Sequence, residues 1–398
     1  MEEICEITIQ DGEERIVFND DFNQKLTLDI MQFLSKYQRV KFGQRFNQSV
    51  DNLPESLTHL EFGEEFNQQV DNLPISLTDI SFGYEFNQPV DNLPESLKTL
   101  IFGVQFNQPV DNLPESLTYL EFGDIFDQPV DKLPYSLTHL IFAYDFDQPI
   151  DNLPSCLTDL RLGYEFNQPV NNLPNSLIHL EFGYCFNQPV DSLPNYIKTL
   201  VFGNGMFNQP VDNLPNGLIY LDFGWSFNQP VDNLPESLIH LTFGDAFDHP
   251  VDNLPNSLTH LEFGSDFNQS LDNLPKPKKR QYDQDSQNGI THLTIGDEFC
   301  KSLKNLPDSI THFTVNGDFY EDCYEGFSAC YLPRSITHFT VTGHFNFIPF
   351  ETTHLRTKRM YPSDIKYLPN TIQEISMPKI FEKTMKDIIP KNIKVDFY

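Results

Sequence analysis

Residues 46–65 read FNQSVDNLPESLTHLEFGEE, and close copies of this stretch follow one another along most of the chain. The first phenylalanine returns every 20 residues, and one extra residue within 204–206 shifts the later copies without interrupting them. The copies start at Phe46, Phe66, Phe86, Phe106, Phe126, Phe146, Phe166, Phe186, Phe207, Phe227, Phe247 and Phe267. Such a fixed period predicts a stack of similar units and not an ordinary globular domain.

Each unit is too short for a pair of helices but long enough for one strand and a return path. Within LTHLEF, Leu60 and Phe62 share one side of an extended chain, while His59 and Glu61 share the other. Gly63 and the turn-forming segment VDNLP then reverse the chain direction. The sequence therefore predicts a repeat solenoid, mainly β, with 20-residue turns, one parallel sheet and irregular return segments.

The repeat divides the chain into three parts. Residues 43–299 hold the regular copies, and residues 300–398 hold degenerate copies followed by a C-terminal cap. Residues 1–42 contain one poor copy at Phe22 and a short amphipathic pattern from Leu28 to Tyr37, which predicts a helix. This segment is expected to be an N-terminal cap, because the end of a solenoid must cover its core. The Leu-Pro steps predict about sixteen turns.

Every repeat position becomes a column of stacked residues. The columns expected to face inward begin at Leu53, Leu57, Leu60, Phe62, Phe66 and Val70. They hardly change along the chain and supply large aromatic and aliphatic groups for a core. The column that begins at Asn47 is expected to hydrogen-bond the backbone of adjacent turns, because an amide both donates and accepts.

A column of aspartates begins at Asp51 and is broken once, at Asn171. We expect each carboxylate to accept backbone N–H groups in the turn before the Leu-Pro step. The alternative is a row of divalent cations, but one carboxylate per turn supplies few of the six to eight oxygens that calcium prefers. We therefore expect no metal site and no cofactor.

Two columns are expected to face outward, and their residues vary from copy to copy. Variable outward residues on a long sheet suit protein binding, and the alternative is a merely solvated face. Successive histidines on a flat sheet do not give the tetrahedral set that zinc needs, and a pH-sensitive patch is the favoured interpretation. The residues predicted to bind a protein partner are His59, Glu61, Tyr119, Glu121, His139, Arg161, His179, Glu181, Tyr220, Asp222, His240, His260 and Glu262.

The chain has 57 acidic and 26 basic residues, for a net charge of −31. This charge argues against nucleic acid or an anionic membrane as partner and favours a basic protein partner. It also favours a monomer, because like charges repel, whereas an exposed terminal strand would favour self-association. No apolar stretch is long enough to cross a bilayer, and the N-terminus lacks the apolar core of a secretory signal. Six irregularly spaced cysteines suit a reducing cell interior, in the cytoplasm or the nucleus.

A twelve-residue insertion carries a basic loop, whose positive residues are Lys276, Lys278, Lys279 and Arg280. The loop is either a nuclear-localisation or docking tag or a tolerated surface insertion. A second insertion contains Cys323 and Cys330, which could join under oxidation. No phosphate loop, dinucleotide fingerprint, nucleophile elbow or zinc-protease motif occurs, so we expect no catalytic residues and no enzyme.

The unit Phe-Asn-Gln-Pro-Val-Asp-Asn-Leu-Pro-x-Ser-Leu-Thr-x-Leu-x-Phe-Gly resembles the FNIP repeat, clearly over residues 43–299 and in degenerate form over 300–398. That family is grouped with the leucine-rich repeats and occurs mainly in amoebae and their large DNA viruses. The resemblance implies a leucine-rich-repeat-like fold and a protein-binding scaffold, acting in the host cell if the source is viral. Two alternatives stay open: a substrate-recognition subunit of a ubiquitin ligase, and a structural protein without a specific ligand.

Overall fold

A computed structural model of the chain describes residues 4–10, 12–276, 289–320 and 332–398. The chain forms two compact units, and each is described by itself. The N-terminal unit comprises residues 1–188 and 192–197, and the C-terminal unit comprises residues 189–191 and 198–398. In the basic loop Lys276 is described and exposed, whereas Lys278, Lys279 and Arg280 lie outside the described residues, as do Cys323 and Cys330.

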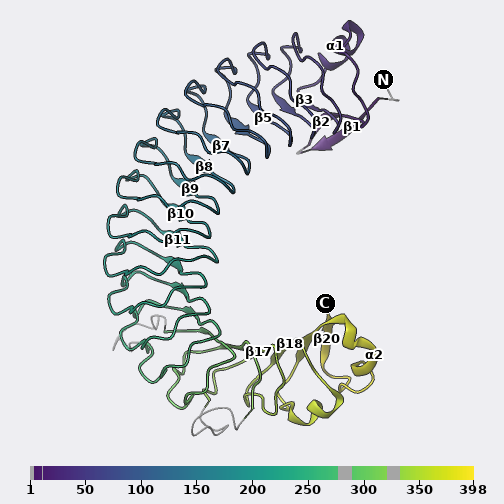
Figure 1. Cartoon of the computed structure of the whole chain (residues 1–398). Helices are drawn as coiled ribbons and strands as arrows, with labels where there is room; N and C mark the ends of the chain where they lie inside the picture. Colours follow the sequence, from purple (N-terminus) through teal and green to yellow (C-terminus); the bar gives the residue numbers. More distant parts are fainter. Residues whose placement is uncertain (1–3, 11, 277–288, 321–331) are drawn as a thin grey trace, which may run out of the picture. The chain divides into compact units, whose positions relative to one another are not determined.

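The N-terminal unit begins with an antiparallel hairpin of β1 (Cys5–Gln10) and β2 (Glu13–Phe18), and β2 pairs in parallel with β3 (Arg39–Lys41). Each later strand of the unit lies beside the next and pairs with it in parallel (Figure 1). In this register His59 lies opposite Asp79. These strands are β4 (His59–Glu61), β5 (Asp79–Ser81), β6 (Thr99–Ile101), β7 (Tyr119–Glu121), β8 (His139–Ile141), β9 (Asp159–Arg161) and β10 (His179–Glu181).

A helix, α1 (Leu28–Leu34), lies between β2 and β3 in the sequence. The Thr27 hydroxyl caps it by accepting the backbone N–H of Ile30 at 3.4 Å, and Ile30 and Leu34 are buried. The helix ends three residues before the predicted end at Tyr37. The hairpin was not predicted, because it lies outside the 20-residue pattern.

The C-terminal unit repeats the same arrangement with somewhat longer strands. Its strands are β11 (Thr199–Val201), β12 (Tyr220–Asp222), β13 (His240–Thr242), β14 (His260–Glu262), β15 (His292–Ile295), β16 (His312–Val315), β17 (His338–Val341), β18 (His354–Thr357), β19 (Glu374–Met377) and β20 (Lys394–Phe397), each parallel to the next. Near the end come two short 3₁₀ segments, η3 (Pro362–Tyr367) and η4 (Lys379–Phe381), and the helix α2 (Glu382–Met385).

The predicted fold class is confirmed: both units are β-solenoids of about 20 residues per turn with a parallel sheet. In the described part of the chain, β3 to β20 mark eighteen turns, two more than the Leu-Pro steps predicted. The two missed strands are β3, which precedes the first complete copy, and β18, which follows a repeat of only sixteen residues between His338 and His354.

The core consists of the predicted inward columns. Leu57 and Phe66 are 0% exposed, and Phe62 is 3% exposed. The rings of Phe62 and Phe66 stack within one turn at 3.8 Å between centroids, and Phe66 stacks on Phe86 of the next turn at 6.1 Å. Two aromatic columns therefore run side by side through most of the regular repeats of each unit, and their stacking helps to set the spacing of the turns.

The asparagine column links neighbouring turns as expected, through its acceptor. The side-chain oxygen of Asn47 accepts the backbone N–H of Asn67 at 3.0 Å and the side-chain amide of Gln68 at 2.8 Å. Asp127 replaces asparagine in this column and accepts the N–H of Asp147 at 3.1 Å in the same way. A carboxylate suffices there because these bonds require only an acceptor.

The glycine after each strand is needed because adjacent turns approach closely at that point. A Cβ at Gly103 would lie 1.9 Å from the carbonyl oxygen of Gly83, which is backbone and has little freedom to move. At Ala143 the chain bends at residues 144–145 without the turn that its neighbours form there. The alanine is thus accommodated by a local change in the backbone.

We expect Gly103→Ala to lower the free energy of unfolding by roughly 1–3 kcal/mol, because the added methyl group pushes two turns apart. The matched control is Ala143→Gly, which should change stability by less than about 1 kcal/mol. Urea unfolding followed by circular dichroism measures both. Equal effects of the two substitutions would contradict the close-approach argument.

Candidate protein-binding face of the sheet

The thirteen predicted binding residues all lie at the first or third position of a strand, on either side of a buried central residue. Eight are in the N-terminal unit, from His59 to Glu181, and five are in the C-terminal unit, from Tyr220 to Glu262. Because the parallel strands pair in register, first positions lie beside first positions and third beside third. The structure therefore places these side chains on the outward face of the sheet in each unit.

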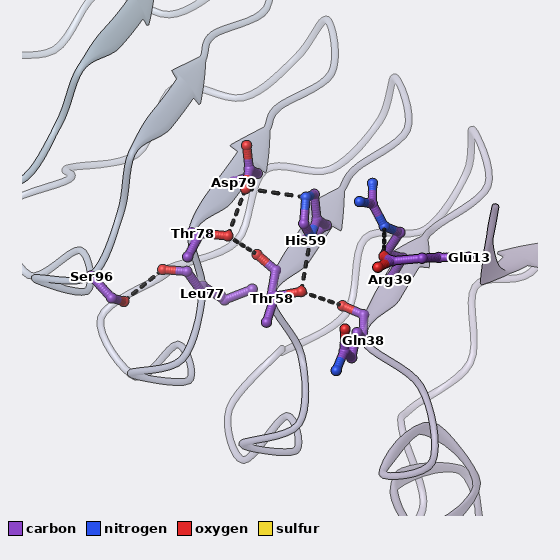
Figure 2. A network of polar contacts seen from close by, with 9 residues as sticks. All are labelled: Glu13, Gln38, Arg39, Thr58, His59, Leu77, Thr78, Asp79 and Ser96. Atoms are coloured by element: carbon purple, nitrogen blue, oxygen red, sulfur yellow. Dashed lines mark hydrogen bonds and ion pairs between the residues drawn. The ribbon is translucent and has the colours of Figure 1, made fainter. Parts of the chain in front are cut away.

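In the N-terminal unit, several ion pairs join the outward side chains of neighbouring strands. Glu61 contacts both Arg15 and Lys41, while Arg39 pairs with Glu13 at 2.7 Å. Farther along, Arg161 pairs with Glu181 at 3.6 Å. Figure 2 shows the Arg39 pair and the neighbouring contact between His59 and Asp79, whose ring nitrogen and carboxylate are 3.2 Å apart. The charges on this face thus largely compensate one another.

A hollow of about 240 Å³ lies over β3 to β6, where small side chains such as Ser81 and Thr99 leave room beside Arg39 and His59. Next to it, the Tyr119 hydroxyl donates a hydrogen bond to Glu121 at 2.7 Å. Burial, and then this carboxylate, raise the pKa of Tyr119 to about 12. Tyr119 consequently stays neutral at physiological pH and offers a partly buried ring to a partner.

The C-terminal unit presents a stack of six imidazoles along the first strand positions of β13 to β18. The ring centroids of successive members are 4.0–4.3 Å apart. The members, called the histidine stack below, are His240, His260, His292, His312, His338 and His354. The first five occupy the same position of the sequence repeat. His354 falls outside the 20-residue spacing because its repeat is short, and the recurring Thr-His dipeptide is the signal that could have revealed it.

A threonine precedes five of these histidines, and its hydroxyl contacts Nδ1 of the ring. Thr291 donates its single hydroxyl proton to the carbonyl of Thr259 at 3.2 Å, and its oxygen lies 2.9 Å from Nδ1 of His292. With the hydroxyl proton assigned to the carbonyl, Nδ1 is the donor in the second contact. In this assignment the neutral ring carries its proton on Nδ1, and Nε2 is an acceptor. The same arrangement recurs at His260, His312, His338 and His354.

Protonation is disfavoured at four members of the stack. Burial, followed by the neighbouring imidazoles, lowers the pKa of His292 to about 4. Burial is also the main cause of the lowered pKa of His260, His312 and His338. The expectation of a patch that titrates near neutrality, next to glutamate, is therefore wrong for these four, because desolvation moves their titration to lower pH.

The geometry does not suit metal coordination. Neighbouring rings of the stack are inclined by only 6–20°, so their in-plane lone pairs run side by side and do not converge on one point. In the part of the chain that the structure describes, no group of three or more His, Cys, Asp or Glu residues is placed to hold a metal ion.

The aspartate column has a different partner from the one expected. Asp71 accepts a hydrogen bond from the side-chain amide of Asn92, one repeat later, at 3.0 Å, where backbone N–H groups were expected. At Lys132 the asparagine is replaced, and the lysine pairs with Asp111 at 2.9 Å. Where the aspartate is replaced by Asn171, the matching donor position is Ser192. The column is therefore a side-chain ladder between turns.

Among the described residues, no helix combines the length and apolar character that crossing a membrane would require.

The short parallel strands, the stacked core columns and the asparagine ladder define a leucine-rich-repeat-like β-solenoid. The FNIP Repeat family matches the chain in eleven overlapping windows between residues 46 and 277. The chain belongs to this family.

One solved structure supports this fold, and two others are similar at a lower level. CroV588, described as a novel circular leucine-rich-repeat protein and coming from a giant virus, is 36% identical, with a TM-score of 0.69 over 95% of this chain and 68% of that chain. YopM from Yersinia enterocolitica is 17% identical over 91% of this chain and 87% of that chain, with a TM-score of 0.38. A chain of the Drosophila Toll–Spatzle complex is 12% identical over 92% and 53%, with a TM-score of 0.49. The last two scores are too low to add to the assignment. A comparison with curated proteins finds no match.

Proposed function

We propose that this chain is a non-enzymatic scaffold inside the cell, or inside the host cell if its source is a virus, that binds a partner protein through the outward face of its sheet. The observation that carries the proposal is the contrast between columns. The central residues are apolar in every strand and mostly leucine, as at Leu60, Leu100 and Leu120, whereas their outward neighbours include charged, polar and aromatic side chains, with one constant run, the histidine stack. Packing thus fixes the core and leaves the outward face free to carry specificity.

The composition of the face supports a partner protein. Tyr119 and Tyr220 lie on it partly exposed, and tyrosine is enriched where proteins bind one another. The imidazole of His139 on the same face is exposed. Residues 4–42, by contrast, continue the sheet and the aromatic columns, with Phe18 stacked on Phe42 at 5.0 Å. No observation favours a separate ligase-adaptor site there, and we do not propose one.

Site-specific photocrosslinking tests the proposal. A benzoylphenylalanine at Tyr119 or Ile101 would probe the sheet face, and one at the exposed Asp91 of the aspartate column would be the matched control, in lysate of the source cell or its host. Protein adducts at the two sheet positions and none at the control would support the proposal. Equal yields at all three positions, or adducts at the control alone, would overturn it.

The net charge of −31 makes a basic partner surface the best fit, because opposite charges speed diffusional encounter. We expect the association rate of the captured partner to fall by about tenfold between 50 and 500 mM salt, with a much smaller change in the dissociation rate. Stopped-flow or surface-based kinetics at several salt concentrations measure this. An association rate independent of salt would show that the negative charge of this chain does not speed its encounter with the partner.

A further inference from the structure

The third strand position carries four glutamates with different surroundings. Glu61 is paired with Arg15, Glu181 is paired with Arg161, and Glu121 accepts the Tyr119 hydroxyl. Glu262, on β14, occupies the same column, and its carboxylate has neither a hydrogen bond nor an ion pair within the described ranges. The chain thus satisfies this position with its own arginines twice and leaves it open in the C-terminal unit.

The surroundings of Glu262 favour a cation. Burial against the sheet, and secondly the charge of Asp222, raise its pKa, although the side chain still reaches solvent. Both effects disfavour the ionised form of the Glu262 carboxyl group. A positively charged group beside it would offset them, because it stabilises the negative charge. No positive side chain is present on β12 to β15, whose outward titratable groups are Tyr220, Asp222, His240, His260, Glu262 and His292.

Glu262 lines a hollow of about 280 Å³ together with three members of the histidine stack, His240, His260 and His292. In the tautomer assigned from the threonine contacts, Nε2 of His260 and of His292 is an acceptor. Neither Nε2 atom has a hydrogen-bond partner among the described residues. The hollow therefore offers one carboxylate and at least two neutral acceptors beside the flat edges of stacked rings.

We propose that this hollow is the docking site for an arginine side chain of the partner protein, held by the Glu262 carboxylate and by Nε2 of His260 and His292. A guanidinium matches the site because its planar fork of five donors can reach a carboxylate and a second acceptor at once, and it packs against flat rings. Lysine carries the charge but not the fork. Within this chain, Arg15 and Arg161 already pair with glutamates at the same strand position as Glu262. The inference rests on the proposed function and specifies which part of the face anchors the partner.

The test uses the full chain and a labelled eight-residue peptide of alternating arginine and serine, with matching lysine–serine and glutamate–serine peptides, followed by fluorescence anisotropy. Glu262→Gln should weaken binding of the arginine peptide about fivefold or more, and His260→Phe, which keeps a ring in the stack, about threefold. The matched control Glu298→Gln removes the same charge from an exposed turn of the same unit and should have less than about a twofold effect.

Equal losses of peptide affinity for Glu262→Gln and Glu298→Gln would overturn the proposal, because binding would then depend only on the net charge of the protein. Equally tight binding of the lysine peptide would overturn the guanidinium assignment. Nitrogen-15 NMR of the imidazoles provides an independent reading: a proton on Nδ1 of His260 and His292 is expected, and a proton on Nε2 would remove the acceptors. If the peptide results fail while partner crosslinks at Tyr119 and Ile101 persist, the proposed function stands and only the arginine site falls.

Discussion

Acidification should destabilise the C-terminal unit before the exposed carboxylates titrate. The pKa of His292 is lowered from 6.5 to about 4 in the folded state. Between these values the unfolded chain binds a proton that the folded chain does not, so the stabilisation is complete above pH 6.5 and disappears as the pH falls through about 4. For His292 alone the loss should be on the order of 1–2 kcal/mol, after allowing for its contact with solvent. His260, His312 and His338 are shifted in the same direction and add to it.

Urea unfolding at pH 7.5, 6, 5 and 4.5 measures this loss, and the fluorescence of Trp225, the only tryptophan of the chain, reports on the C-terminal unit. The comparison variant is His292→Phe, which keeps an aromatic ring in the stack but has no proton to bind. Its stability should fall less steeply with acidification than that of the original chain. Identical slopes for the two proteins would contradict the conclusion that the folded stack excludes protons.

The regular part of the fold could be predicted because one stretch of sequence specifies it repeatedly. Each copy states again which residues face inward, so the core at Phe62 and Phe66 and the outward positions of His59 and Glu61 follow from simple alternation. The hairpin of β1 and β2 could not be found in this way. Its strands are paired by a local turn and bear no relation to the 20-residue period.

The candidate site was only partly visible in the sequence for a different physical reason. Alternation tells which way a side chain points but not what it touches, so the stack at His292 and the open carboxylate at Glu262 required the spacing of the strands. The aspartate column shows the same limit. Asp71 and Asn92 lie 21 residues apart, and only the stacking of turns brings them together.

The largest loss of stability is expected on removing a buried phenylalanine that packs against both aromatic columns. Phe106 is 0% exposed, and its ring stacks on Phe102 at 3.6 Å and on Phe86 and Phe126 at 6.0 Å. Phe106→Ala should lower the free energy of unfolding by about 3–5 kcal/mol, because it removes a large buried ring and leaves a cavity between rigid turns. Urea unfolding with hydrogen exchange measures both the size of the loss and its extent along the chain.

The neighbouring column supplies a built-in comparison. Leu162 occupies the position equivalent to Phe102 and is only 4% exposed, so leucine can fill that column without exposing the core. Phe102→Leu should therefore cost about 1–2 kcal/mol, clearly less than Phe106→Ala, and Tyr135→Ala, at a side chain that is 73% exposed, should cost less than about 0.5 kcal/mol. Because each turn contacts only its neighbours, the loss of protection from exchange in Phe106→Ala should be greatest in the turns around residue 106 and fade with distance. A uniform loss throughout the N-terminal unit would instead mean that the unit unfolds as a single cooperative block, and the nearest-neighbour account of its stability would have to be abandoned.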